Sequence, residues 1–141
     1  MQHIERAKKW YEQATSENDE FLKFLLLYIT FEVACKGERN IRNIGSNSKV
    51  KTNFYSNITE NHLGELKNQL DERPLQNMLH KEKMIRLESI HDFTNILEFV
   101  ITIRHNLIHG DKGIDEPRDL EIVKEGTKIL QPLVKSLLDV M

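Results

Sequence analysis

One segment of this chain, EFLKFLLLYITFEVACKG at residues 20–37, is apolar on nearly every side of a helix. A helix that is hydrophobic all round has to be covered by other elements, so this segment predicts the buried centre of a helical bundle. Gly37 is expected to end the helix. Its most apolar part, residues 24–35, is interrupted by Thr30 and Glu32 and is too short to span a bilayer. We therefore expect no membrane association.

The rest of the chain also carries apolar residues at helical spacing, and glycine (6) and proline (3) are scarce. No segment alternates with the period of two that marks a strand, so we expect essentially no sheet. The predicted elements are a helix at Ile4–Thr15, a second helix from a cap at Asn18 or Asp19 to about Lys36, a loop at Glu38–Asn57, a helix at Glu60–Glu72 capped by Thr59 and ended by Pro74, a short helical piece at Leu75–His80, a long helix at Ile90–His109 capped by Ser89, and a final helix from Pro117 that Pro132 kinks or splits. The sequence predicts one all-α domain over residues 1–141, a compact bundle of four or five helices.

Composition limits the classes of function. Hydrophobic residues make up 39% of the chain and charged residues 30%, as in ordinary globular domains, and the net charge is −2. That charge excludes a protein that coats nucleic acid through bulk positive charge, so any such contact must come from a local patch. The only cysteine, Cys35, lies in the apolar helix, where we interpret it as a buried, inert thiol. The lack of a disulfide partner and a polar N-terminus unlike a signal peptide favour a cytoplasmic protein.

The segment RHNLIHGDK, at residues 104–112, pairs an arginine with a histidine five positions later. Similar pairs occur at Arg73–His80 and Arg86–His91. The first contains Pro74 and the second spans the predicted helix start at Ser89, so neither fits the end of a continuous helix. Only the segment at residues 104–112 has that context. It resembles the signature of HEPN domains and, in the fuller form R-polar-N-L-x-H-G-x-K, that of their Apea-like branch.

The resemblance implies a small helical bundle in which the motif ends a long helix and two copies meet as a two-fold homodimer. It also implies that the shared cleft cleaves RNA without a metal ion. Arg104 and His109 are then the expected catalytic residues, with Glu32, His105 and Asn106 in supporting roles. His105 and His109 share a helix face and could bind a metal, but no third ligand lies nearby in the sequence. We expect neither a metal nor another cofactor.

The surroundings of Arg104 carry information of their own. Its neighbours three and four positions away on the helix are all apolar, so its guanidinium lies on or beside a face meant for burial and needs an anionic partner. A structural ion pair with Glu32 is, without the resemblance, as good an interpretation as catalysis. With the resemblance, Glu32 is expected to orient Arg104 or His109 rather than to act as an acid or base. A five-residue offset turns a helix by roughly 140°, so Arg104 and His109 are expected to flank a groove.

These residue types suit the cleavage of RNA by transesterification. A base takes the proton of a 2′-hydroxyl, the oxygen attacks the adjacent phosphorus, and an acid protonates the leaving 5′-oxygen. Histidine can fill either role near neutral pH, and arginine binds phosphate oxygens through two N–H groups at once. One histidine per chain is too few for both proton transfers, which gives a dimer a mechanistic reason.

The most basic stretch carries five cations against a single acid, namely Lys36, Arg39, Arg42, Lys49 and Lys51. We expect this stretch, together with Lys112, to contact the RNA backbone. A solvated flexible loop that binds nothing is an equal alternative. Trp10 and Tyr11 are expected in the core rather than as a base-stacking platform.

Two functions remain open on the sequence. The first is a metal-independent endoribonuclease, a toxin or defence component restrained by an antitoxin or by a partner in a larger defence system. The second is a HEPN fold without catalytic activity that serves as an interaction or nucleotide-sensing module. The intact arginine, asparagine, histidine and glycine of residues 104–110 favour the enzyme.

Overall fold

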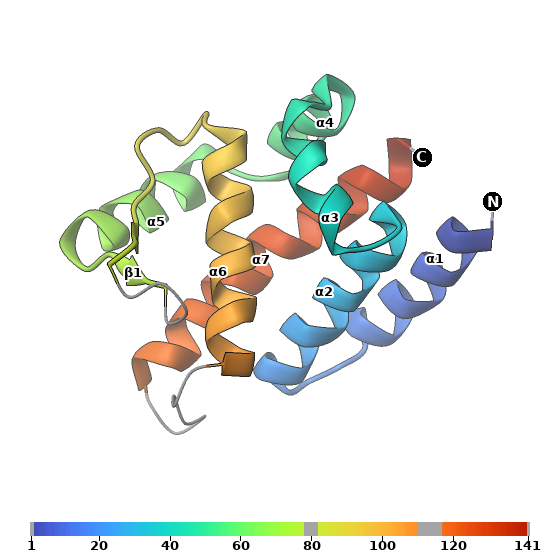
Figure 1. Cartoon of the computed structure of the whole chain (residues 1–141), viewed down its shortest axis with the longest axis horizontal. Helices are drawn as coiled ribbons and strands as arrows, with labels where there is room; N and C mark the ends of the chain where they lie inside the picture. The colour runs from blue at the N-terminus through green and yellow to red at the C-terminus, as the bar shows by residue number, and fades with distance from the viewer. Residues whose placement is uncertain (1, 78–81, 110–116, 141) are drawn as a thin grey trace.

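The computed structural model describes residues 2–77, 82–109 and 117–140 (Figure 1). Helices dominate this part of the chain, and their bounds are α1 Gln2–Thr15, α2 Glu20–Cys35, α3 Glu38–Ile41, the 3₁₀-helix η1 Arg42–Ser46, α4 Ser48–Asn57, α5 Glu60–Glu72, α6 Phe93–His109 and α7 Pro117–Val140. Two short strands, β1 Leu75–Gln76 and β2 Met84–Ile85, lie between α5 and α6. This mostly helical structure is compatible with the predicted all-α class and has more helices than the four or five expected. No helix in the described ranges is long and apolar enough to cross a membrane.

The apolar segment at residues 20–37 forms α2, with α1 packed along one side and α7 along another. Figure 1 shows α6 standing in front of α7, with α2 between α1 and α6 in the view. Phe24, Leu27, Phe31 and Ala34 of α2 are fully buried. Asp19 caps α2 by accepting a hydrogen bond from the Leu22 amide, so the predicted cap is confirmed.

The predicted loop at Glu38–Asn57 is wrong, because this stretch folds as α3, η1 and α4. Its polar residues act at the helix joints: the Asn47 side chain accepts hydrogen bonds from the amides of Lys49 and Val50 and so caps α4. The apolar residues between these joints are buried in the core, namely Ile41, Ile44, Val50 and Phe54. Burial of these four apolar side chains stabilises helices in a segment whose composition is typical of a loop.

The predicted helical piece at Leu75–His80 is also wrong where the structure describes it. Leu75 and Gln76 form β1, which pairs antiparallel with β2 through Leu75↔Ile85 and Gln76↔Met84. Leu75 and Ile85 are both buried, so the ribbon presents one side to the core. Residues 78–81 lie outside the described ranges. The small ribbon also corrects the expectation of essentially no sheet.

Two helix details differ from the sequence predictions. Helix α6 begins at Phe93 rather than Ile90, because the Asp92 side chain accepts a hydrogen bond from the Asn95 amide and caps the helix there. Helix α7 runs unbroken from Pro117 to Val140, so Pro132 does not split it.

Candidate functional site

Arg104 lies in the second-last turn of α6, on the side of the helix that approaches α2. Its side chain is 22% exposed, and its guanidinium carbon lies 5.5 Å from the centroid of the Tyr28 ring. Its Nη2 atom lies 3.8 Å from Oε1 of Glu32. Tyr28 and Glu32 are one turn apart on α2, so an aromatic face and a carboxylate from the same helix meet one arginine. The predicted pairing of Arg104 with Glu32 is present.

The two contacts differ in character. A separation of 3.8 Å is longer than the ~2.9 Å of a hydrogen bond, and the Glu32 side chain is 30% exposed, so this ion pair contributes at most about 1 kcal/mol. The Tyr28 contact adds roughly 0.5–1 kcal/mol of cation–π attraction and fixes the guanidinium over the ring. Sequence reasoning did not predict the Tyr28 contact. The useful signal was an aromatic residue one turn before the acid on the same helix.

His109 is the final residue of α6, as expected for the histidine of the motif. Its side chain, Gly110 and Lys112 lie outside what the structure describes. A five-residue helical offset places His109 roughly 140° around α6 from Arg104.

The two remaining supporting residues differ in their environments. Asn106 is 6% exposed, and its Nδ2 atom donates a hydrogen bond of 2.8 Å to the backbone oxygen of Gln76 in β1. Asn106 thus joins the motif helix to the small ribbon. His105 is half-buried. Sequence reasoning missed Asp119, which is 7% exposed and lines a small cavity with Asn106. Asp119 was hard to single out in the sequence, because an acidic residue in the first turn of a helix is common.

The predicted RNA contacts carried by α3, η1 and α4 lie toward the start of α6, whereas Lys36 lies one turn beyond Glu32 at the end of α2. Figure 1 shows α3 and α4 near the start of α6, whereas the motif is at its end. Arg42 forms an ion pair with Glu98, and Lys36, Arg39, Lys49 and Lys51 are exposed.

An apolar strip runs along α2 next to Glu32. Leu22 is 45% exposed and Ile29 is 39% exposed, and they lie two turns apart on one face of the helix. Partly buried residues on the same side extend this face, namely Leu25, Leu26 and Val33. Ile108 of α6 is 51% exposed. We call these six residues the α2–α6 apolar surface. Core-like side chains left open beside a cationic motif are typical of an interface.

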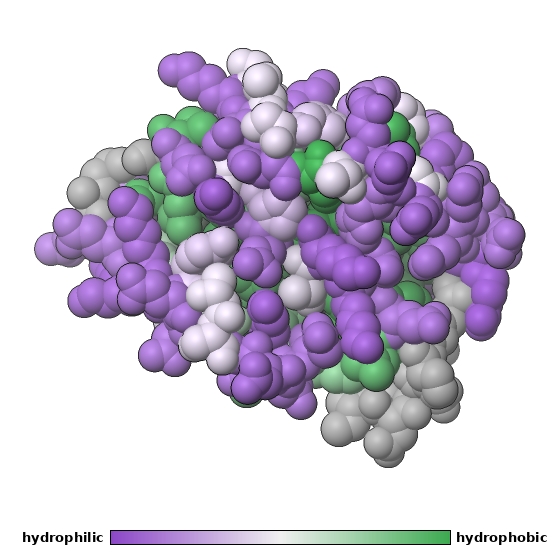
Figure 2. Space-filling model, turned by 180° about the vertical axis from the view of Figure 1, so that it is seen from behind, coloured by the Kyte–Doolittle hydropathy of each residue, from purple (hydrophilic) through white to green (hydrophobic). Residues whose placement is uncertain are grey.

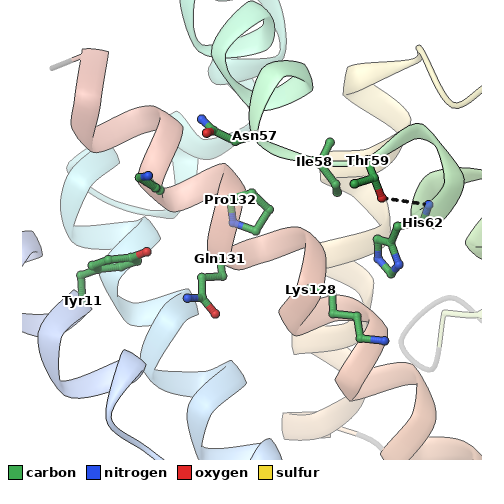
Figure 3. A pocket seen from close by; sticks show the side chains of 9 residues that line it. Tyr11, Asn57, Ile58, Thr59, His62, Lys128, Gln131 and Pro132 are labelled. Atoms are coloured by element: carbon green, nitrogen blue, oxygen red, sulfur yellow. Dashed lines mark hydrogen bonds between the residues drawn. The ribbon is translucent and has the colours of Figure 1, made fainter.

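A separate groove of about 400 Å³ lies over α7 (Figure 3). Its basic side chains are Lys128 and Lys135, His62 lines it as well, and no carboxylate is among its lining residues. The His62 side chain is 16% exposed, and its Nε2 atom lies 3.4 Å from Oε2 of Glu125. Lys128 Nζ lies 3.5 Å from the other oxygen of the same carboxylate. Sequence reasoning did not find this groove.

The predicted burial of Cys35 is confirmed, and this burial raises the pKa of its thiol from 9.0 to about 12. Trp10 contradicts its prediction: it is 39% exposed on the outer side of α1 rather than in the core. Tyr11, the next residue, is partly buried against the core.

Comparisons with models of known protein families, with curated proteins and with solved structures find no match to this chain.

Proposed function

We propose that this protein is a metal-independent endoribonuclease of the HEPN type that cleaves RNA in a cleft shared by two copies of the chain. The observation that carries the proposal is the setting of Arg104. A partly exposed guanidinium is fixed over the Tyr28 ring and beside Glu32, five residues before the histidine that ends the same helix. A guanidinium held in a fixed position can bind the oxygens of a phosphate group without first having to be ordered.

In the proposed reaction, one His109 takes the proton from a 2′-hydroxyl and the oxygen attacks the adjacent phosphorus. The bond to the 5′-oxygen breaks as the second His109 protonates the leaving group, giving a cyclic 2′,3′-phosphate and a free 5′-hydroxyl. Arg104 binds the phosphoryl oxygens as negative charge builds on them. Glu32 positions Arg104 and takes no proton.

The α2–α6 apolar surface supports the dimer. Burial of exposed leucine and isoleucine side chains releases about 25 cal/mol per Å² of apolar area, and Leu22, Ile29 and Ile108 are available for it. Because this surface adjoins Glu32 and the last turn of α6, an interface formed there brings the two motifs close to each other.

An inactive interaction module is the second candidate, and one observation favours it. The Tyr28 and Glu32 contacts account for Arg104, and the bond to Gln76 accounts for Asn106, by packing alone. In this alternative the motif holds α6 to α2 and to β1 and does no chemistry.

The two candidates differ in a cleavage assay run in EDTA. We expect the purified protein to cut single-stranded RNA and His109→Ala to lose at least a hundredfold in rate while it still binds, since general acid–base catalysis contributes about 10²–10⁴. His91→Ala is the matched control, because His91 is exposed and belongs to one of the other arginine–histidine pairs. Sedimentation should show a dimer that Ile29→Glu disrupts together with activity.

Arg104→Ala requires a folding check, because it also removes the contacts with Tyr28 and Glu32. Arg104→Lys keeps the charge without the two-pronged geometry, so it should fold and cut slowly. If His109→Ala cuts as fast as the unmodified protein, the enzyme proposal fails and the module replaces it.

A further inference from the structure

The end of α2 carries a basic residue in a backbone conformation that suits glycine. Lys36 follows the last residue of the helix with φ 61° and ψ 46°, in the left-handed region, and its side chain is exposed. A side chain in this region costs stability that glycine would not cost, and such strained positions cluster at functional sites. Lys36 also lies one turn beyond Glu32, whose carboxylate is 3.8 Å from Arg104. The strained cation therefore adjoins the candidate site.

Two more basic side chains reach the end of α2 from α1. The two helices form an antiparallel hairpin, so the start of α1 lies beside the end of α2 (Figure 1). His3 and Arg6 are three positions apart and share one side of α1. Partial burial of His3, and then the positive charges of Lys36, the N-terminus and Arg6, hold the pKa of its imidazole below the usual value. We call His3, Arg6 and Lys36 the hairpin basic cluster.

The acids nearest to this cluster face elsewhere or have another partner. Glu5 is two positions from His3, an offset that turns a helix by about 200°, so it lies on the other side of α1. Glu32 lies beside Arg104. Within the described part of the chain, neither Arg6 nor Lys36 forms an ion pair with a carboxylate. The positive charge of the cluster is therefore open to a ligand.

The surroundings of the cluster favour an anion as that ligand. The chain as a whole has a net charge of −2, so a local group of basic side chains is a distinct feature of its surface. Figure 2, which views the molecule from behind, shows a face that is mostly hydrophilic, including the edge formed by α1 on the left of the view, with only small separate apolar patches. That face lacks the apolar centre typical of a protein interface, whereas basic side chains attract phosphates.

The distance from the cluster to Arg104 suits two phosphates of one strand. The four residues from Glu32 to Lys36 rise about 6 Å along α2, and the flexible four-carbon stem of lysine extends the reach of its ammonium group. A nucleic-acid strand carries one phosphate per ~3.4 Å of helical rise. A strand with one phosphate at Arg104 therefore brings another to the cluster within a few nucleotides.

We propose that Lys36, Arg6 and His3 form a second phosphate site, which holds the backbone of the RNA strand a few nucleotides from the phosphate at Arg104. The inference rests on the proposed function for the identity of the strand and for the place of the scissile phosphate. Lys36 and Arg6 bind phosphate oxygens by charge, and the His3 imidazole donates a hydrogen bond.

Binding is measured with a single-stranded 2′-O-methyl RNA, which lacks the nucleophilic hydroxyl and stays uncut. Each phosphate contact with a single strand contributes about −0.7 to the slope of log affinity against log salt. Lys36→Gln with Arg6→Gln should therefore make this slope, followed by the anisotropy of a labelled strand, shallower by about 1.4. The matched control is Lys8→Gln with Lys124→Gln, which removes two charges from exposed positions elsewhere on α1 and α7 and should leave the slope nearly unchanged.

Lys36→Gly separates a binding role from a structural one. Glycine suits φ 61°, so this variant should unfold at a higher urea concentration than the unmodified protein. One phosphate contact gains about fivefold in affinity when salt falls from about 1 M to 0.1 M, so the variant should bind the strand about fivefold more weakly at the lower salt. Greater stability together with weaker binding indicates a residue that acts on a ligand.

The position of the site is measured on the strand itself. Neutral methylphosphonate groups replace the phosphates one at a time, and binding should weaken most at the phosphate that the cluster holds. In Lys36→Gln with Arg6→Gln the same replacement should have little further effect, because the charge it contacts is already gone. The sensitive phosphate should lie within a few nucleotides of the cleavage site mapped on RNA of the same sequence.

Three results would overturn the inference: an unchanged salt slope in the double variant, unmodified affinity in Lys36→Gly, or no binding of the strand at all. RNA cleavage that continues beside either of the first two results would leave the proposed function standing. A protein that cuts no RNA, yet binds the uncut strand through Lys36 and Arg6, would refute the proposed function and leave the phosphate site in place.

Discussion

Gly126 of α7 lies where α2 and α6 meet, and adding one methyl group there should separate them. A Cβ at this position would lie 2.6 Å from Cδ1 of Ile103 and 3.0 Å from Cε2 of Phe24. Both distances are too short for carbon atoms, so the side chains would have to move. Ile103 precedes Arg104 on α6, and Phe24 lies one turn before Tyr28 on α2, so the same contact helps to set the spacing of the candidate site.

Gly126→Ala changes the free energy of unfolding through two opposing effects. Overpacking a core position costs about 1–3 kcal/mol. Replacing glycine by alanine inside a helix contributes about 1 kcal/mol in the other direction. Gly64→Ala in α5 is the matched control, because a Cβ there meets nothing within 4 Å and only the helix gain applies. The two variants should therefore differ in free energy of unfolding by about 1–3 kcal/mol, with Gly64→Ala the more stable.

Urea unfolding followed by far-ultraviolet circular dichroism measures both variants against the unmodified protein. We expect Gly64→Ala to raise the urea midpoint and Gly126→Ala to leave it unchanged or lower it. If Gly126→Ala stabilises the protein as much as Gly64→Ala does, the three helices do not meet as closely as described. The account of how Arg104 reaches Tyr28 and Glu32 would then fail with it.

Two further predictions concern the end of α2. Lys36 has φ 61° and ψ 46°, a left-handed conformation that favours glycine, and the following Gly37 has φ 110°. Lys36→Gly should stabilise the protein by roughly 0.5–1 kcal/mol, and Gly37→Ala should destabilise it by about 1–3 kcal/mol; equal thermal midpoints for the two variants would contradict this. Since the pKa of Cys35 is raised from 9.0 to about 12, its thiolate fraction at pH 8 falls about a thousandfold, and a disulfide reagent should react quickly only after urea unfolds the chain. Fast reaction of the folded protein would show that the thiol is accessible.

Sequence patterns predicted the long helices well because burial and capping are local signals. Helix α5 has the predicted bounds Glu60–Glu72 and the predicted cap at Thr59, where the side chain accepts from the His62 amide. Residues 38–57 were misjudged because polar residues at helix caps resemble a loop when only composition is considered. The ribbon at β1 and β2 depends on pairing between residues eight and ten positions apart, to which helical periodicity gives no weight.

The candidate site was only partly visible in the sequence. An apolar setting for Arg104 implied an anionic partner, and Glu32 in the apolar helix was the candidate considered. The Tyr28 contact and the bond from Asn106 to Gln76 depend on how α6 crosses two other elements, which no local pattern encodes. Trp10 was misplaced for a related reason: helical spacing shows which residues share a face, but not which face is covered.

The hydrogen bond from Asn106 to Gln76 gives part of the RHNLIHG segment a folding role. Replacing Asn106 by an apolar residue would remove this hydrogen bond, a loss of about 0.5–1.5 kcal/mol whether or not the protein acts on RNA. Asn106 should therefore be kept for stability even in a variant without the proposed activity, because marginal stability leaves little room for such a loss. In such a variant, residue 109 at the end of α6 would be the first residue of the motif free to change, because only the proposed activity requires a histidine there.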